Sequence, residues 1–354
     1  MDKHIMPWLT APIAPPDEAA MAQAQARWDS VAKPLGSLGL LETVVVKMAG
    51  LTGNADYRIQ RRAHCVFCAD NGVVAQGVSQ AGSDITRIMA EGLLAHNTCV
   101  CHMARSAHAE VFPMDVGMNT EVEGMPTDKT RRGTGDISLG PAMTPGQAHD
   151  AIGAGFLLAQ QLIEQGYQIL STGEMGIGNT TSSSAMAAVL LGKDVEAVTG
   201  RGAGLNSDGL QHKIDVIQRA IDLNRPDAAD AMDVLCKLGG FDIAAMAGVF
   251  LAGAVYRVPV LIDGLISAVS ALTAVRLRPT SHGAMLASHV SAEPAAHWLL
   301  EELGLQPLIT ANMRLGEGTG AVAALPLLDM AFAVYHGMST FGDMGIKSYK
   351  RPQE

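Results

Sequence analysis

The amino-acid sequence predicts an α/β protein built on a mostly parallel sheet. Short apolar runs of strand length recur along the chain, and each is followed by turn residues and then by a stretch with helical periodicity. Parallel strands need long, right-handed crossover connections, which helices usually supply, so this alternation favours a parallel sheet. The composition agrees, because 48% of the 354 residues are hydrophobic and only 17% are charged. A chain of this length suggests roughly two domains.

The elements are expected in a regular order. The N-terminal part is expected to form a helix over 17–31, a turn over 33–39 and a helix over 39–53. The clearest strands are HCVFCAD (64–70), AEVFPMDVG (109–117), YQILSTGE (167–174) and VPVLIDG (258–264). Helical patterns fill the connections over 144–165, 181–192 and 210–224. The uncharged run 243–256 is too short to span a bilayer and is interpreted as a buried core helix.

Charge and cysteine usage exclude several classes of protein. The net charge is −10 and no basic run occurs, which argues against a nucleic acid as partner. The start of the chain lacks a charged segment followed by an apolar one, so neither a secretory signal nor a membrane span is predicted. We expect the five cysteines to be reduced thiols in a cytoplasmic protein.

No metal site and no cofactor are predicted. Cys65 and Cys68 have CxxC spacing, but no second pair occurs, so buried strand cysteines are favoured over a metal site. His282, His289 and His297 are spaced by seven and eight residues, and no HExxH motif occurs. The absence of a GxSxG motif also disfavours a serine hydrolase.

Acidic residues recur where strand-like runs end. Asp70, Asp115, Glu174 and Asp263 each have a glycine one or two residues further on, and the loop around Glu317 has the same form. Ligands of an open parallel sheet bind outside the carboxyl ends of its strands, so these acids are expected to gather on one rim. For any single acid the alternative remains that aspartate and glycine merely end strands and cap helices.

Three glycine-rich loops point to an anionic ligand. They are GEMGIGNTT (173–181), TGRGAGL (199–205) and RLGEGTGA (314–321). Backbone N–H groups of such loops, leading into helix N-termini, bind anions. The first loop nearly matches a P-loop but has Asn179 in place of the lysine, and the second lacks GxGxxG spacing. A phosphate-bearing ligand is therefore favoured over ordinary turns, whereas a nucleotide triphosphatase is not.

Few cations lie near these loops in the sequence. Lys213 follows the second loop by about a dozen residues, Arg201 lies within it, and Arg314 opens the third loop. Each is a candidate phosphate ligand, and for each the alternative is a solvated surface charge.

The motifs resemble those of a known family. KPLGSLGLLE, CADNGVVAQGVSQ, GEMGIGNTTSSSA, KLGGFDIAAMAG, VLIDGLISA and RLGEGTGA occur in this order over nearly the whole chain. As an ordered set they closely resemble the nicotinate-nucleotide–dimethylbenzimidazole phosphoribosyltransferases, the CobT family. The resemblance implies transfer of phosphoribose from nicotinate mononucleotide to 5,6-dimethylbenzimidazole, giving α-ribazole 5′-phosphate and nicotinate in cobamide assembly.

The resemblance also implies an architecture. The expected fold is a Rossmann-like, mostly parallel sheet flanked by helices, with a small helical domain formed from both ends of the chain. Residues 1–55 and 326–354 would form the small domain, and 56–325 the catalytic domain. The expected partners are small-molecule substrates and a second copy of the chain, and a heterodimer with a paralogue is the alternative.

Site residues follow from the motifs that match. The resemblance assigns Glu317 as the catalytic base and Glu174 as a second acid of the site. It assigns the phosphoribosyl and nicotinate contacts to Gly176, Gly202, Lys213, Ser291, Arg314 and Gly316. It assigns the pocket for the aromatic base to Ser79, Gln80, Met175 and Leu315, together with position 89. Met89 departs from the family, whose familiar members have a glutamine there, which leaves the identity of the base open.

The chemistry of the implied reaction fits a single general base. The pyridine leaves as a neutral ring, so no general acid is needed, while the attacking azole must lose its ring proton. Rim carboxylates are suited to stabilise a cation-like C1′, and the bound phosphate holds that carbon in place. Two alternatives remain: the same reaction with adenine, another benzimidazole or a phenolic base, and a non-catalytic nucleotide-binding protein.

Overall fold

A computed structural model describes residues 7–129 and 131–349. Its centre is one sheet of five strands in the order β2-β1-β3-β4-β5, and every pair of neighbours is parallel. The strands are β1 (Arg62–Ala69), β2 (Glu110–Gly117), β3 (Ile169–Met175), β4 (Val260–Ile262) and β5 (Met285–Ala287). The predicted parallel α/β fold is therefore confirmed, and β5 is the strand that the sequence did not reveal.

Helices connect the strands, precede the first strand and follow the last. They are α1 (Pro7–Thr10), α2 (Glu18–Ser30), α3 (Leu40–Thr52), α4 (Asp84–Leu94), α5 (Cys99–Ser106), α6 (Pro145–Glu164), α7 (Asn179–Leu191), α8 (Val195–Val198), α9 (Ser207–Asn224), α10 (Ala231–Leu238), α11 (Phe241–Tyr256), α12 (Leu265–Leu277), α13 (Ala296–Glu302) and α14 (Thr319–Gly337). Two 3₁₀ turns, η1 (Gly72–Gln76) and η2 (Pro279–Ala284), complete the regular structure of the described residues. All the helices expected from the sequence are present, each within a few residues of its predicted bounds.

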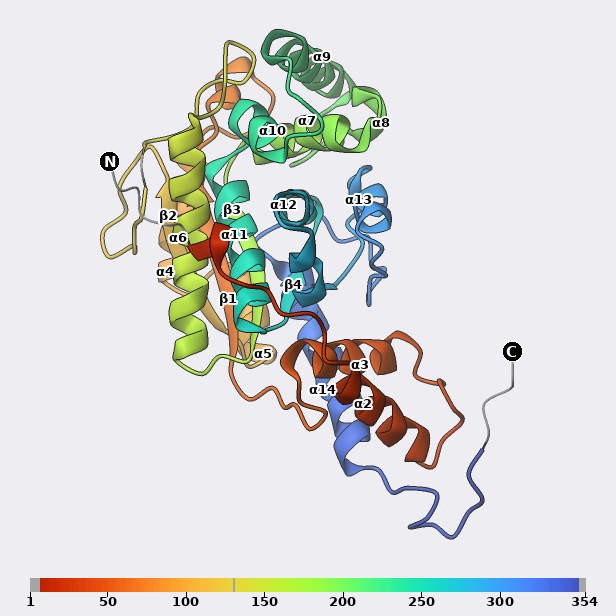
Figure 1. The fold of residues 1–354 in the computed structure, drawn as a ribbon. Coiled ribbons are helices and arrows are strands. Elements are labelled where there is room, and N and C mark those ends of the chain that lie inside the picture. The colour runs from red at the N-terminus through yellow and green to blue at the C-terminus, as the bar shows by residue number, and fades with distance from the viewer. Residues whose placement is uncertain (1–6, 130, 350–354) are drawn as a thin grey trace.

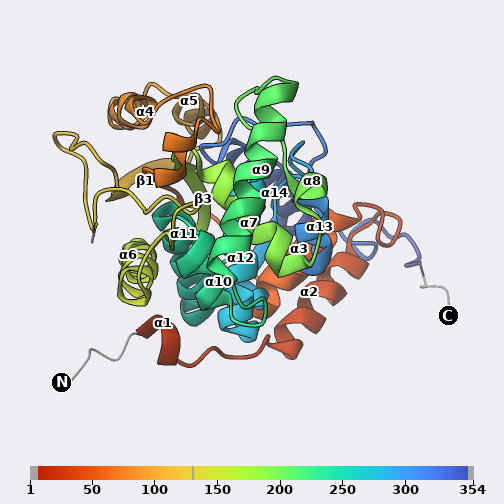
Figure 2. The same ribbon diagram turned by 90° about the horizontal axis from the view of Figure 1, so that it is seen from above.

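Helices cover both faces of the sheet. Helices α6 and α11 lie on one face, and α4 and α5 lie on the other (Figure 2). A Cβ atom on Gly155 of α6 would lie 1.8 Å from the carbonyl oxygen of Ala245 in α11, and one on Gly248 would lie 2.0 Å from that of Ile152. Small residues thus let the two helices approach closely. Helix α11 is buried along nearly its whole length, which confirms the predicted core helix.

The CxxC pair lies inside β1. Cys65 packs into the core on one face of the sheet and Cys68 into the core on the other, because residues three apart in a strand point to opposite faces. Both thiols are free and fully buried, as the sequence analysis favoured.

Helices α2 and α3, from the N-terminal part of the chain, lie beside the lower end of α14 and the residues that follow it (Figure 1). Arg27 of α2 donates a hydrogen bond to the carbonyl of Tyr335 at 2.9 Å, and the hydroxyl of Tyr335 donates one to the carbonyl of Ala55. The expected boundary at 325–326 falls inside α14, which continues through Pro326. Residues 1–6 and 350–354 of the expected terminal segments lie outside the described residues. The division into two domains therefore stays a prediction.

Helix α14 is the one described helix that is long and apolar enough to cross a membrane by length and composition alone. In this fold it contributes Val322, Leu325 and Leu328 to the core beside the sheet. It packs against α3, α5 and β3, so apolar side chains of α14 are used for packing inside the protein.

The strand order decides where a ligand can bind. Strand β1 lies between β2 and β3. The connection from β1 to β2 runs toward one edge of the sheet, and the connection from β2 to β3 runs back toward the other edge. This reversal creates a switch point between β1 and β3. The order 2-1-3-4-5 is the other doubly wound arrangement, not the 3-2-1-4-5-6 order of the dinucleotide-binding Rossmann fold. Helices α7 to α10 lie beyond the carboxyl ends of the strands (Figure 1).

Candidate active site

A cleft opens at this switch point, between the loops that follow β1 and β3 and the loop that precedes α14. All the predicted site residues except Met89 line it: Ser79, Gln80, Glu174, Met175, Gly176, Gly202, Lys213, Ser291, Arg314, Leu315, Gly316 and Glu317. The fold therefore collects residues that are spread over more than two hundred positions of the sequence. Their individual roles remain predictions.

Each of the three glycine-rich loops lies before a helix. The loops lead into α7, α9 and α14, and the residues just before α7 and α14 are Gly178 and Gly318. Both glycines have left-handed backbone angles, with φ of 92° and 84°. Such turns need glycine, and they direct the free N–H groups of the first helical turn toward the cleft. An anion binds favourably at such N-termini.

Glu317 has an unusual backbone. Its φ is 58°, in the left-handed region that side chains other than glycine seldom occupy, and Gly316 and Gly318 on either side have φ of 91° and 84°. The side chain is buried, and its Oε2 accepts a hydrogen bond from the backbone N–H of Val100 at 2.9 Å. The other rim acids lie within or directly after the last residues of a strand, whereas Glu317 precedes α14.

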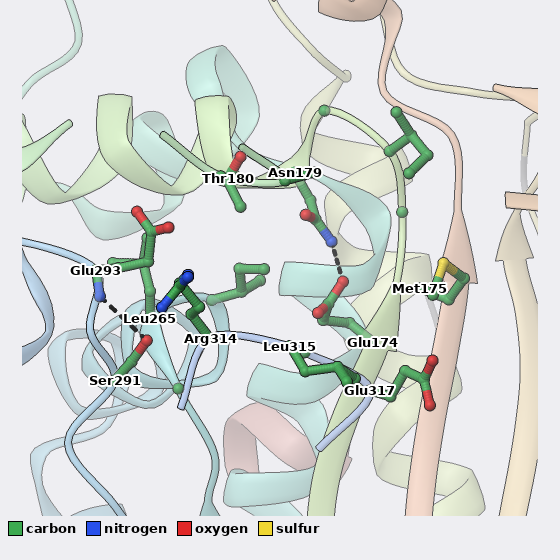
Figure 3. Close-up of a pocket in the computed structure, with 18 of the residues that line it drawn as sticks. Glu174, Met175, Asn179, Thr180, Leu265, Ser291, Glu293, Arg314, Leu315 and Glu317 are labelled. Atoms are coloured by element: carbon green, nitrogen blue, oxygen red, sulfur yellow. Dashed lines mark hydrogen bonds between the residues drawn. The ribbon is translucent and has the colours of Figure 1, made fainter. Parts of the chain in front are cut away.

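Glu174 lies at the end of β3 and is held by an amide. The Nδ2 of Asn179 donates hydrogen bonds to Oε2 of Glu174 and, at 2.8 Å, to Oδ2 of Asp242 (Figure 3). Burial, assisted by the nearby carboxylate of Asp242, raises the pKa of Glu174 to about 8. Glu174 is thus largely protonated at neutral pH in the free protein. Figure 3 also shows that the carboxyl groups of Glu174 and Glu317 point in different directions.

Asp242 is a residue that the sequence analysis missed. It is fully buried at the start of α11, and burial raises its pKa to about 6. Its position within KLGGFDIAAMAG, one of the motifs of the family resemblance, was the available signal.

A buried cation marks one corner of the cleft. The Nζ of Lys213 donates hydrogen bonds to Oγ1 of Thr180 at 3.0 Å and to the carbonyl of Gly200 at 3.3 Å. Burial lowers the pKa of this amine to about 8, and the carboxylate of Glu293 opposes that shift. A Cβ on Gly202 would lie 3.5 Å from this Nζ, so the second glycine loop passes directly over the lysine.

Arginine side chains and Ser291 complete this corner. Arg201 and Arg314 are exposed residues that line the cleft, and Ser291 lies beside Glu293, whose N–H it accepts at 3.3 Å (Figure 3). Lysine, arginine, hydroxyl and loop N–H groups are the usual ligands of a phosphate. The three cations that the sequence placed near the loops therefore share one cleft.

Asp263 and His289 form a further polar pair in the cleft. Oδ1 of Asp263 accepts the backbone N–H of Ala321 at 3.0 Å and lies 3.8 Å from Nδ1 of His289. Burial raises the pKa of Asp263, and His289 offsets part of that shift. The sequence analysis weighed His289 only as a metal ligand.

The expectation that five acids gather on one rim is only partly right. Glu174, Asp263 and Glu317 line the cleft, but Asp70 and Asp115 do not. Asp115 pairs with Lys129 at 2.7 Å and accepts two backbone N–H groups, and Asp70 accepts the N–H of Asn119 at 2.7 Å. These two acids organise the loops after β1 and β2, as the alternative interpretation of strand-ending acids predicts.

Apolar side chains also line the cleft. Leu315 is 55% exposed at its edge, and Met175 lies half-buried beside the glycine loop. The side-chain amide of Gln80 donates a hydrogen bond to the carbonyl of Gly204 and so joins two loops of the cleft. An exposed leucine and a half-buried methionine in one cleft suit the flat face of an aromatic ring.

Met89 does not line the cleft, so its expected place in the base pocket stays a prediction. It lies half-buried on α4, whose buried residues are Thr86, Ala90 and Leu93. Thr86 faces the cleft loops, because its hydroxyl accepts the N–H of Ile177 at 3.2 Å. Met89 lies three residues after Thr86, which places it on the same side of α4 one turn further along. Among the described residues, no group of three or more His, Cys, Asp or Glu side chains is arranged to hold a metal ion.

The fold and the cleft together define a class: a doubly wound α/β protein whose glycine loops and buried lysine suit a phosphate-bearing ligand. Comparison with known proteins narrows this class. A family model described as phosphoribosyltransferase matches residues 13–346. Nicotinate-nucleotide–dimethylbenzimidazole phosphoribosyltransferases of Ruminiclostridium cellulolyticum and Desulforudis audaxviator are 45% and 44% identical, over 93% and 96% of this chain and 94% and 97% of their own lengths. A crystal structure of CobT from Thermus thermophilus superposes with a TM-score of 0.89 at 38% identity, covering 94% of this chain and 100% of that one.

The chain therefore belongs to the nicotinate-nucleotide–dimethylbenzimidazole phosphoribosyltransferase family, a family of pentosyltransferases. The resemblance inferred from the ordered motifs is confirmed, and so is the enzyme class that it implied.

Proposed function

We propose that this chain transfers the phosphoribosyl group of nicotinate mononucleotide to 5,6-dimethylbenzimidazole or a related lower-ligand base. The products are an α-ribazole 5′-phosphate and nicotinate, as the nucleotide loop of a cobamide requires. One observation carries the proposal: a single cleft has a cationic corner at Lys213, an apolar side chain at Leu315, and Glu317 and Glu174 in its lining. A phosphate and an aromatic base can bind at these two places, with the reacting carbon between them.

Glu317 is the proposed general base. Its Oε2 is already occupied by the N–H of Val100, which orients the carboxylate and leaves Oε1 to accept the ring proton of the attacking base. Attack on C1′ from the side opposite the nicotinate breaks one C–N bond as another forms, and the configuration inverts from β to α. The proton passes to Glu317, and the nicotinate leaves with the bonding electron pair.

Glu174 is proposed to respond to the charge of the substrate. In the free protein it is largely protonated, because burial raises its pKa to about 8. A pyridinium nucleotide brings positive charge next to it, which favours the ionised form. The resulting carboxylate is placed to stabilise the cation-like C1′ of the transition state.

The phosphate is proposed to bind at Lys213. Gly176, Gly202 and Gly316 leave room for the backbone to approach the ligand, and Ser291 and Arg314 supply further donors. Binding energy from this remote phosphate holds C1′ in position for attack.

Three further proposals concern the surroundings of the reaction. The enzyme acts as a homodimer in the cytoplasm, and a heterodimer with a paralogue is the alternative. The accepted base is 5,6-dimethylbenzimidazole, with adenine, another benzimidazole or a phenolic as alternatives, because Met89 departs from the family's glutamine. A non-catalytic nucleotide-binding protein is disfavoured, because such a protein gains little from acids that face a phosphate ligand.

One assay tests the function and its alternatives. Nicotinate release from nicotinate mononucleotide is measured with each base of a panel in turn. Release with 5,6-dimethylbenzimidazole, coupled to formation of the α-nucleotide, supports the main proposal. Release with adenine or a phenol only supports the other lower ligands. Binding of the nucleotide without release for any base, also after addition of the paralogue, would mean that the chain is a binding protein.

A further inference from the structure

The side chain of His64 lies directly behind the loop that carries Glu317. It comes from β1 and is fully buried. Its Nε2 lies 2.7 Å from the carbonyl oxygen of Glu317, and its Nδ1 lies 2.8 Å from Oγ of Ser171 on β3. A carbonyl oxygen only accepts hydrogen bonds, so Nε2 must carry the proton. In the neutral ring Nδ1 then accepts the proton of the serine hydroxyl at 2.8 Å, in competition with the more distant carbonyl of Ala63 at 3.3 Å.

The surrounding glycines are shaped around this ring. A Cβ on Gly318 would lie 2.0 Å from Cε1 of His64, and a Cβ on Gly173 would lie 2.7 Å from Nε2. Any larger residue at either position would displace the imidazole from the Glu317 carbonyl. Glycine at these two positions therefore leaves room for the imidazole to reach the carbonyl of Glu317, and Gly318 also allows the left-handed turn.

The carbonyl that His64 holds belongs to a strained residue. A left-handed backbone at a residue other than glycine costs on the order of 1–3 kcal/mol and persists only where surrounding contacts impose it. Two contacts reach Glu317 from different elements: His64 binds its carbonyl, and Val100 binds its carboxylate. Rotation of the loop into an ordinary conformation would break the first contact and move the carboxylate away from the second.

We propose that His64 is a positioning residue for the general base, because its Nε2–H holds the Glu317 backbone in the conformation that directs the carboxylate toward the incoming ring. This inference rests on the proposed role of Glu317. His64 itself has no route to the substrate, since both its nitrogens are occupied and the ring is fully buried. Burial lowers the pKa of His64 to about 4, so the ring stays neutral at every pH at which the enzyme is assayed.

Two substitutions separate positioning from packing. His64→Leu introduces an apolar side chain of similar size without a donor, and His64→Gln offers an amide N–H near the position of Nε2. For His64→Leu we expect kcat to fall roughly 10–100-fold, the scale of a misplaced catalytic group, with the KM for nicotinate mononucleotide within about twofold of wild type. His64→Gln should recover most of that loss. Equal activity of the two variants would overturn the proposal.

A double-mutant comparison asks whether His64 acts through Glu317. In a Glu317→Gln background the change His64→Leu should have no further effect on kcat, because the group that His64 positions is gone. Multiplicative losses in the double variant would contradict the proposal. If wild-type enzyme releases no nicotinate with any base, the proposed function fails instead, and the two failures are thus distinguishable.

A spectroscopic measurement on the unaltered protein covers the case in which the variants do not fold. The ¹⁵N resonances of a histidine ring distinguish the two neutral tautomers. Wild-type protein should show His64 with its proton on Nε2 at neutral pH. A proton on Nδ1 in the wild type would exclude the hydrogen bond to Glu317 and overturn the proposal.

Discussion

The carboxylate of Glu317 accepts a hydrogen bond from the backbone N–H of Val100, 2.9 Å away, although 217 positions separate the two residues. Val100 lies in the first turn of α5, where backbone N–H groups have no partner within the helix. The contact ties the loop before α14 to the crossover between β1 and β2. It leaves one carboxylate oxygen for chemistry and fixes the direction in which that oxygen points.

The substitution Glu317→Gln tests the assignment of the general base. The amide keeps the shape of the side chain but cannot take the ring proton, so kcat should fall by about 10²–10⁴-fold while the KM for nicotinate mononucleotide changes little. Steady-state kinetics with 5,6-dimethylbenzimidazole measure both constants. Glu196→Gln on the exposed surface of α8 is the matched control and should behave like wild type. Activity within about threefold of wild type for Glu317→Gln would remove Glu317 from this role.

The substitution Lys213→Ala tests the phosphate corner. Loss of a charged donor costs about 1.5–3 kcal/mol, so the KM for nicotinate mononucleotide should rise at least about tenfold with a smaller change in kcat. Lys193→Ala, at an exposed position, is the control. Because the pKa of Lys213 is lowered to about 8, the wild-type KM should itself rise as the pH passes 8 and the amine loses its charge. An unchanged KM for Lys213→Ala would place the phosphate elsewhere.

The raised pKa of Glu174 predicts how stability depends on pH. Between its ordinary value of 4.5 and about 8, the folded protein keeps a proton that the unfolded chain has lost. The free energy of unfolding therefore falls as the pH rises through this window, by at most about 1.4 kcal/mol per pH unit for this group. Glu174→Gln removes the titration, so its Tm should decline less than that of wild type between pH 5 and pH 8. Thermal scans across that range check this, and parallel curves for the two proteins would contradict it.

Leu315 and Met89 were both predicted to line the base pocket, but only Leu315 lines the cleft. Leu315 lies exposed at the cleft edge, whereas Met89 lies on α4 outside the lining. Leu315→Ala should raise the KM for the aromatic base several-fold, because apolar contact with the ring is lost. Met89→Ala should change that KM less than about twofold. A larger effect at Met89 than at Leu315 would show that position 89 reaches the base after all.

A glycine substitution tests the packing behind Glu317. Gly318→Ala places a methyl group 2.0 Å from the His64 ring at a φ of 84°, so both overlap and backbone strain oppose folding. Gly304→Ala has a similar φ of 62° but no atom within 4 Å of the new Cβ, and it isolates the strain. Gly304→Ala should cost about 1 kcal/mol, and Gly318→Ala clearly more. Denaturant unfolding measures both, and equal losses would show that the ring yields without cost.

Much of the architecture could be predicted from local pattern alone. The apolar runs that form β1 to β4, and the helical periodicity between them, are properties of neighbouring residues. They can therefore be recognised without knowledge of the fold. Strand β5, Met285–Ala287, was missed because it follows directly on a 3₁₀ turn and lacks the longer apolar run, VPVLI, that surrounds the equally short β4. The glycine loops could also be predicted, because left-handed turns favour glycine and therefore enrich a short stretch of sequence in it.

Patterns in the sequence were enough to establish the α/β class, the glycine loops and, through the ordered motifs, the family and most of the residues that line the cleft. The state of each acid, by contrast, depends on the folded chain. Asp115 ends a strand in the same way as Glu174, yet Lys129 pairs with the first while Asn179 and Asp242 surround the second. The partners of a side chain come from distant parts of the chain, and burial beside those partners sets its charge, so no local pattern contains that information.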